Sequence, residues 1–179
     1  ALFRRVFDLM SIRNEGFASP LNARFSNIPG ARYCSLTPED TAFGSLGDFF
    51  QTDLLAYDGG WFISPPYVES IIFRILNYTM ETFKRAKMTG RTLTVVLFLP
   101  DWGDINTLLD AQEEHVNHQV FGNKRGYQKF FMQDQDGKLV RGLFNCRFTL
   151  LMTETDSDLR RSMTKKMSAC LEAIKDRKV

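Results

Sequence analysis

The sequence predicts an open α/β fold with a mostly parallel sheet and an antiparallel edge. Segments typical of strands alternate with helical patterns as far as about residue 112, which is the order of a parallel sheet. Residues 93–99 are almost continuously apolar, as expected of a strand that is buried on both faces of such a sheet. The last strand-like segments, up to residue 152, have the turn signals of an antiparallel pair.

Length and composition predict one globular domain. The chain has 179 residues, of which 44% are hydrophobic and 25% are charged, so a disordered or collagen-like chain is excluded. We expect a single domain over 1–179, with its core at about 15–155 and a terminal helix at 156–179. Sixteen phenylalanines is a high number for this length; we expect some in the core and several at a site where rings meet a flat ligand. The net charge of +2 is too small to indicate a nucleic-acid partner by itself.

No metal site, disulfide framework or membrane span is predicted. The three cysteines are Cys34, Cys146 and Cys170, an odd number without metal-ligand spacing, so we expect reduced thiols in an intracellular protein. His115 and His118 have no carboxylate at a clear metal spacing. No apolar run reaches about 18 residues, and charged residues interrupt the N-terminal segment where a signal peptide would lie. The chain begins with Ala1, so we expect processing or a longer parent chain.

The first half of the chain predicts short elements with marked ends. Residues 1–12 have the apolar spacing of a helix, and residues 15–19 form a short apolar stretch that ends at Pro20. Residues 21–28 suit a helical turn, and residues 33–36 a short buried strand.

The middle of the chain gives the clearest patterns. Residues 43–50 suit a loop, residues 61–63 a strand, and residues 93–99 the central strand. A long helix between these strands ends at Gly90, with its apolar side at Val68, Ile72, Ile75, Leu76, Thr79 and Phe83. Residues 104–112 can form another helix.

The last third predicts strands and one helix. Residues 117–132 suit strands, residues 135–138 a hairpin turn, and residues 147–152 a further strand. Residues 156–177 predict a polar terminal helix.

Four proline-containing segments follow predicted strand positions. They are Ser19-Pro20, Thr37-Pro38, Ser64-Pro65-Pro66-Tyr67 and Pro100-Asp101-Trp102. Ligands of open α/β sheets bind beyond the carboxyl ends of the strands, so we expect these four segments to lie along one ligand-binding edge.

The motif Ser64-Pro65-Pro66-Tyr67 carries the most chemistry. It fits the pattern of Asp, Asn or Ser, then Pro-Pro, then an aromatic residue, which is typical of methyltransferases acting on planar amino groups. The Ser64 side chain and the Pro65 carbonyl can accept the two hydrogens of an exocyclic amine, and the prolines fix that carbonyl with little loss of entropy. Tyr67 can stack on the base. The structural alternative is that Ser64 caps a helix whose first residue is proline.

Other features are weaker. The glycine-rich loop Phe43–Gly47 lacks the spacing of a phosphate or dinucleotide loop, and it needs no ligand. Glu39-Asp40 follows a short strand, where an acid often binds a ribose hydroxyl, although an acid in a turn is more often only solvated. Basic residues on the terminal helix are more simply a solvated face.

Several motifs together have a familiar order over about residues 15–155. They are Phe17-Ala18-Ser19-Pro20-Leu21-Asn22, Tyr33-Cys34-Ser35, Phe43-Gly44-Ser45-Leu46-Gly47, Ser64-Pro65-Pro66-Tyr67 with Glu69, Phe98-Leu99-Pro100-Asp101-Trp102, and Asn145. In this order and spacing the chain resembles the phosphorylated-CTD-interacting-factor family, the cap-specific adenosine N6-methyltransferases. The resemblance implies a Rossmann-like methyltransferase domain that uses S-adenosyl-L-methionine and methylates the first transcribed adenosine of capped mRNA.

The resemblance also implies roles for individual residues. Those implied to line the cofactor are Ser19, Pro20, Asp40, Phe43, Gly44, Ser45 and Gly47. Those implied to hold the adenine, as the catalytic set, are Ser64, Pro65, Pro66 and Tyr67. Those implied to bind the rest of the substrate are Glu69, Trp102 and Asn145. The implied partner is RNA, together with a helical region or a protein partner that helps to grip it. The implied location is the nucleus rather than the cytoplasm.

The motif departs from the family at three positions. Ser64 stands in place of Asn, Tyr67 in place of Phe, and Phe144 in place of His. Tyr keeps the stacking face, whereas Ser is shorter and offers one hydroxyl in place of an amide. Two alternatives therefore stay open. One is a catalytically inactive module that binds RNA or a protein partner, and the other is an N-methyltransferase acting on a small molecule or a protein.

Overall fold

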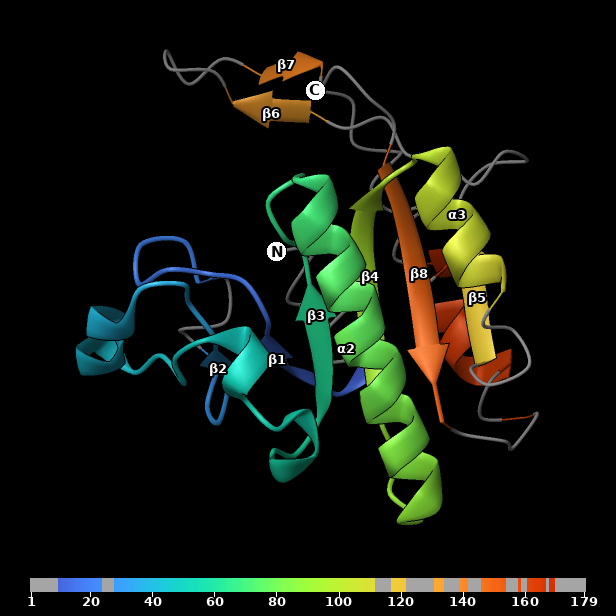
Figure 1. The fold of residues 1–179 in the computed structure, drawn as a ribbon, viewed down its shortest axis with the longest axis horizontal. Coiled ribbons are helices and arrows are strands. Elements are labelled where there is room, and N and C mark those ends of the chain that lie inside the picture. Colours follow the sequence, from blue (N-terminus) through green and yellow to red (C-terminus); the bar gives the residue numbers. More distant parts are fainter. Residues whose placement is uncertain are drawn as a thin grey trace.

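The computed structural model describes residues 10–23, 28–111, 117–121, 131–133, 139–141, 146–153, 158, 161–166 and 168–169. Figure 1 shows the arrangement of its elements. The strands are β1 (Ile12–Glu15), β2 (Arg32–Tyr33), β3 (Gly60–Ile63), β4 (Thr94–Pro100), β5 (Asn117–Phe121), β6 (Phe131–Gln133), β7 (Leu139–Arg141) and β8 (Cys146–Met152). The helices are α2 (Glu69–Met88) and α3 (Gly103–Asp110), with three short 3₁₀ helices, η1 (Pro38–Phe43), η2 (Phe49–Gln51) and η3 (Leu54–Ala56).

The main sheet has the strand order β2-β1-β3-β4-β8-β5. The first four strands are parallel, and β8 runs antiparallel to both β4 and β5. This confirms the predicted mostly parallel α/β sheet with an antiparallel edge. The chain passes from β1 outward to β2 and then crosses to β3 on the other side of β1. The connections therefore change direction between β1 and β3, which is where open α/β sheets bind ligands.

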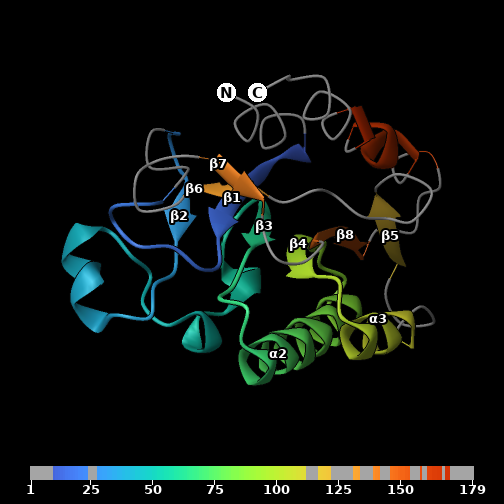
Figure 2. The ribbon, with the colours of Figure 1, turned by 90° about the horizontal axis from the view of Figure 1, so that it is seen from above.

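Apolar side chains cover both faces of the sheet. Trp61, Val95 and Leu97 belong to the core under α2, whereas Phe62 and Val96 belong to a second core on the other face. Figure 2 shows α2 and α3 on one side of the sheet and the helical residues 161–166 on the other. The apolar run predicted at residues 93–99 is therefore a strand buried on both sides, β4, which is parallel to β3 and antiparallel to β8.

Helix α2 follows its predicted pattern with one exception. Its buried side includes Ile72, Ile75, Leu76, Thr79 and Phe83, and its chain turns at Gly90, where φ is +64°. Val68, which was expected on the apolar side, instead precedes the helix as its N-cap and is 48% exposed. Helix α3 and strand β8 also lie where the sequence predicts them.

The start of the sheet corrects a prediction. A helix was expected over residues 1–12, but Ile12 already begins β1, and residues 1–9 lie outside the described part. The strand has no alternating apolar pattern because Asn14 and Glu15, both polar, are buried in it. The buried Asn14 amide nitrogen donates to the Asp58 carbonyl oxygen at 3.0 Å, whereas its side-chain oxygen has no partner among the described residues. The strand predicted at 33–36 is likewise shorter, at Arg32–Tyr33.

Strands β6 and β7 form a separate antiparallel pair. They flank residues 135–138, where a hairpin turn was predicted, and that segment lies outside the described residues. The terminal helix predicted at 156–177 is helical at 158, 161–166 and 168–169, and its remaining residues are not among those described. None of the helices described here is long and apolar enough to cross a bilayer.

Candidate functional site

A cavity of about 390 Å³ lies where the chain crosses from β2 to β3. Its walls come from the segments that follow β1, β2 and β3: Phe17, Ala18, Ser19, Asn22, Leu36, Thr37, Asp40, Ser64, Pro65 and Pro66. Three of the four proline-containing segments therefore meet at one place, because parallel strands end at the same edge. The fourth segment, Pro100–Trp102, is not among the lining residues.

The segment after β1 forms one wall through a tight turn. The Asn22 side-chain oxygen accepts a hydrogen bond from the Ser19 backbone N–H at 2.7 Å, and the Ser19 carbonyl accepts one from Ala23 at 2.8 Å. Pro20 suits this turn because its ring fixes φ. Ser19 lines the cavity, whereas Pro20 is outside the lining and shapes the turn that presents Ser19.

The segment after β2 brings a carboxylate to the cavity. Asp40 lies in η1, whose first turn begins at Pro38, and its backbone N–H donates to the Thr37 carbonyl at 3.1 Å. Its half-buried carboxylate has no hydrogen bond or ion pair with any described residue. Burial raises the pKa of the Tyr33 hydroxyl, and the Asp40 charge adds to that rise. Of the described residues that line the cavity, only Asp40 is ionisable.

The loop Phe43–Gly47 lies beside the cavity without lining it. The Ser45 hydroxyl is buried, lies 2.8 Å from the Ser35 hydroxyl and accepts a hydrogen bond from the Gly47 N–H at 3.0 Å. Gly44 and Gly47 both have φ of +89°, which L-residues rarely adopt. In this structure the contact between Ser45 and Ser35 holds the loop against the end of β2. The cofactor roles of Phe43, Gly44, Ser45 and Gly47 remain predictions.

The segment after β3 presents unsatisfied acceptors to the cavity. Helix α2 begins at Glu69 and its N-cap is Val68, so the prediction that Ser64 caps this helix is wrong. The Pro66 carbonyl accepts a hydrogen bond from the Val68 N–H at 2.8 Å. By contrast, the Pro65 carbonyl and the Ser64 hydroxyl make no hydrogen bond within the described part of the chain. Both acceptors are available to a ligand.

The other predicted substrate residues lie outside the cavity lining. Tyr67 and Trp102 are half-buried and pack against the core under α2. Glu69 is exposed in the first turn of α2, where its charge favours the helix N-terminus. Asn145 lies outside the described residues. The substrate roles of these four residues therefore stay predictions.

An aromatic floor under the cavity was not predicted. Phe17 lines the cavity, and its ring centroid lies 4.9 Å from that of Phe49 and 6.1 Å from that of Phe50. Tyr78 of α2 closes the cluster, with its ring 5.4 Å from Phe49. The many phenylalanines in the sequence indicated such a site, but no local pattern shows which rings meet.

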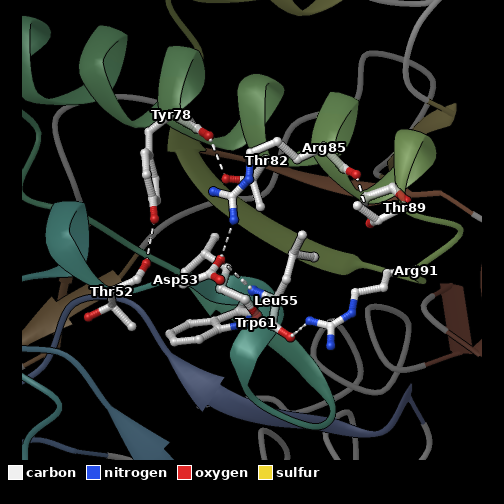
Figure 3. A network of polar contacts seen from close by, with 11 residues as sticks. Thr52, Asp53, Leu55, Trp61, Tyr78, Thr82, Arg85, Thr89 and Arg91 are labelled. Carbon is white, nitrogen blue, oxygen red and sulfur yellow. Dashed lines mark hydrogen bonds and ion pairs between the residues drawn. The ribbon is translucent and has the colours of Figure 1, made fainter.

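Polar contacts hold residues 52–55, which follow Phe49 and Phe50 in the chain, to Tyr78 and Arg85 of helix α2 and to Trp61 and Arg91 (Figure 3). The Tyr78 hydroxyl donates to the Thr52 carbonyl, and Arg85 forms an ion pair with Asp53 at 2.8 Å. Further along, the Trp61 indole N–H donates to the Leu54 carbonyl at 3.0 Å, and Arg91 donates to the Leu55 carbonyl at 2.9 Å. The connection between β2 and β3 is therefore held in place although it contains no long element.

The described residues form neither an activated cysteine nucleophile nor a group of metal-binding side chains. Cys34 is buried, and burial raises the pKa of its thiol to about 11, so it is not a thiolate near neutral pH. The described residues contain no group of three or more His, Cys, Asp and Glu side chains that could hold a metal ion. What the cavity offers is one carboxylate, several hydroxyls and a free carbonyl between apolar walls.

The chain was compared with family models, with curated protein sequences and with solved structures. A family model described as the phosphorylated CTD interacting factor 1 WW domain matches residues 1–132, which include every described element from β1 to β5. No curated protein sequence matches the chain. Among solved structures, the precorrin-6y C5,15-methyltransferase of Geobacter metallireducens GS-15 is similar over 84% of this chain and 86% of that chain, at 12% identity and a TM-score of 0.46. Likeness of that size identifies no substrate.

Proposed function

The chain belongs to the family of the phosphorylated CTD interacting factor 1 WW domain, and from this premise we propose that it is an S-adenosylmethionine-dependent RNA methyltransferase. The proposed acceptor is the N6 amine of an adenosine, namely the cap-adjacent adenosine of mRNA. This substrate implies an intracellular, nuclear protein with RNA as its partner. The observation that carries the proposal is the cavity between β1 and β3. The Asp40 carboxylate, the Ser64 hydroxyl and the Pro65 carbonyl all lie in its lining, and none of them has a hydrogen-bond partner among the described residues.

The cavity suits a cofactor of this size and chemistry. Its volume of about 390 Å³ falls in the usual range for small-molecule sites. Asp40 would accept hydrogen bonds from ribose hydroxyls, as acids after the second strand do in related sheets. Phe17 and Leu36 would supply apolar contact, and Ser19 a hydroxyl. S-adenosylmethionine, when bound, supplies an electrophilic methyl group.

Ser64 and Pro65 would orient the acceptor amine. The nitrogen lone pair of an exocyclic amine is delocalised into the ring, and this makes the amine a weak nucleophile. The Ser64 hydroxyl and the Pro65 carbonyl can each accept one of its hydrogens, which favours a more tetrahedral nitrogen. Pro65 is buried and Pro66 follows it, so the carbonyl direction is fixed before substrate arrives. Most of the rate would come from this positioning.

A methyltransfer assay with capped RNA tests these roles. Ser64→Ala removes one acceptor, and we expect kcat to fall by about 100-fold or more, as when one positioned hydrogen-bonding group is lost from an active site. Ser70→Ala, the same change at an exposed position of α2, should leave kcat unaltered. Undiminished transfer by Ser64→Ala, with an unchanged melting temperature, would refute the assigned role.

One observation favours a second candidate function. Serine reaches less far than the asparagine usual at this position, so the chain could be an inactive module that keeps the fold and binds RNA or a protein partner. Ser64→Asn separates the two. If the wild type is inactive and this variant gains activity, the binding module is correct. Uncapped RNA, free adenosine and protein acceptors in the same assay test for the other N-methyltransferase classes.

A further inference from the structure

Arg74 is an exposed cation without a charged partner. It lies in the second turn of α2, and its guanidinium carbon is 3.8 Å from the centroid of the Phe50 ring. The described residues offer it no ion pair or hydrogen bond. Two other arginines differ in this respect, because Arg85 pairs with Asp53 at 2.8 Å and Arg147 lies 3.6 Å from Asp110. The N–H groups of Arg74 are thus free for a ligand.

The stack on Phe50 fixes where this cation lies. The centroid of the Phe50 ring lies 5.4 Å from that of Phe49 and 6.1 Å from that of Tyr78. The backbone N–H of Phe50 donates to the Asp48 carboxylate at 3.0 Å. A guanidinium over a fixed ring gives up little further freedom when it binds an anion. Arg74 is therefore preorganised although it is exposed.

Phe50 also links Arg74 to the cavity. Its ring lies 6.1 Å from that of Phe17, which lines the cavity, so Arg74 is two ring contacts away from the lining. Among the described residues, the lining contains a carboxylate and no cation. Contacts between cations and phosphates provide most of the affinity for nucleic acids. When the base of an RNA strand occupies this cavity, the cations that contact its phosphates must therefore lie outside the described lining.

We propose that Arg74 binds a phosphate group of the RNA whose adenosine occupies the cavity. The planar guanidinium can donate two parallel hydrogen bonds to phosphate oxygens while its face stays on Phe50. This inference rests on the proposed function, and it adds a substrate contact outside the motifs that resemble the family.

Salt dependence of RNA binding tests the contact. The dissociation constant would be measured by fluorescence anisotropy between 50 and 300 mM salt. One probe is an uncapped single-stranded RNA of 12 nucleotides with a 5′ dye. The other has the same sequence with an unlabelled 5′ cap and a 3′ dye. Removing one cation that contacts a phosphate makes the negative slope of log K against log salt shallower by about 0.7 for a single strand. We expect this loss for Arg74→Gln, together with a several-fold weaker affinity at the lowest salt.

Two control variants make the result specific. Arg85→Gln is the same change on the same helix, at an arginine already paired with Asp53, and it should keep the wild-type slope. Arg74→Lys keeps the charge and should keep the slope, with weaker binding because the stacked fork is lost. Melting temperatures of all variants show whether each one is folded.

The outcomes separate the inference from the proposed function. A slope reduced in Arg74→Gln on both RNAs supports a contact to the strand, and a reduction only on the capped RNA supports a contact to the phosphates of the cap. If the wild type binds RNA and Arg74→Gln has the same slope on both, the inference is overturned and the proposed function stands. If the wild type binds neither RNA, both are overturned.

Discussion

Gly16 shows how one residue sets the distance between the first strand and the aromatic floor. A Cβ atom at this position would lie 2.9 Å from Cε2 of Phe49 and 3.1 Å from Cγ1 of Ile63. Both neighbours are buried, so neither can move away freely. The missing side chain therefore lets Phe49 pack directly against the end of β1, next to the residues that line the cavity.

Gly16→Ala should destabilise the protein. We expect the free energy of unfolding to fall by about 1–3 kcal/mol, because an extra methyl group must be accommodated in a packed core. Gly103→Ala is the matched control, since a Cβ there meets no atom within 4 Å and the residue is helical. That variant should gain up to about 1 kcal/mol. Urea denaturation would measure both, and equal effects of the two changes would contradict this account.

At the scale of elements, a buried arginine of β8 links this strand to α3 and to the segment that follows β4. Arg147 of β8 donates to the side-chain oxygen of Asn106 in α3, and the Asn106 amide nitrogen donates to the Asp101 carboxylate at 2.7 Å. Arg147 is opposite Leu99 of β4 and is only 9% exposed. Its Nε has no partner in the described structure, so its remaining contacts matter more.

Asn106→Ala should therefore cost more than the loss of one surface contact. It leaves a buried guanidinium group without its acceptor, which costs about 1–3 kcal/mol. Asp110→Asn weakens the other contact of Arg147, at 3.6 Å to a side chain that is 62% exposed, and should cost less than about 1 kcal/mol. Thermal and urea unfolding of both variants would decide, and a larger loss for Asp110→Asn would reverse the ranking.

At the scale of the whole molecule, the order of the strands makes the site. Three strands that are separate in sequence end side by side because β1 lies between β2 and β3 and all three are parallel. Loops that carry Ser19, Asp40 and Ser64 thereby meet at one cavity. A ligand held by all three loops binds only the folded chain and should stabilise it as a unit.

Saturating S-adenosylhomocysteine should raise the melting temperature. At 100 times its dissociation constant a ligand adds about 2.7 kcal/mol, which corresponds to roughly 5–10 °C for a chain of this length. Asp40→Asn should lose most of this rise, because the amide has one acceptor oxygen and no charge, whereas the carboxylate has two acceptor oxygens and a negative charge. Glu39→Gln, at the exposed neighbouring position, should retain the rise. An unshifted wild-type melting curve would count against the cofactor site.

Much of this arrangement could be predicted from local patterns. The helix at Glu69–Met88 and the strand at Thr94–Pro100 follow from apolar spacing, because their periodicity is strong and their ends are marked by Gly90 and proline. Strand β1 could not be predicted in this way. Its polar residues Asn14 and Glu15 are buried in the sheet, and the carbonyl that accepts from the Asn14 amide nitrogen belongs to a segment more than forty residues away.

The sequence by itself determined the fold class, the family and the motif Ser64-Pro65-Pro66, since these depend on residue types at fixed spacing along the chain. Tertiary structure alone decided that Ser64 faces a cavity rather than capping α2, that Phe17 forms its floor, and that Arg74 rests on Phe50. Each of these depends on contacts between segments far apart in sequence. Such contacts form only when the parallel strands bring those segments together, and no local pattern records them.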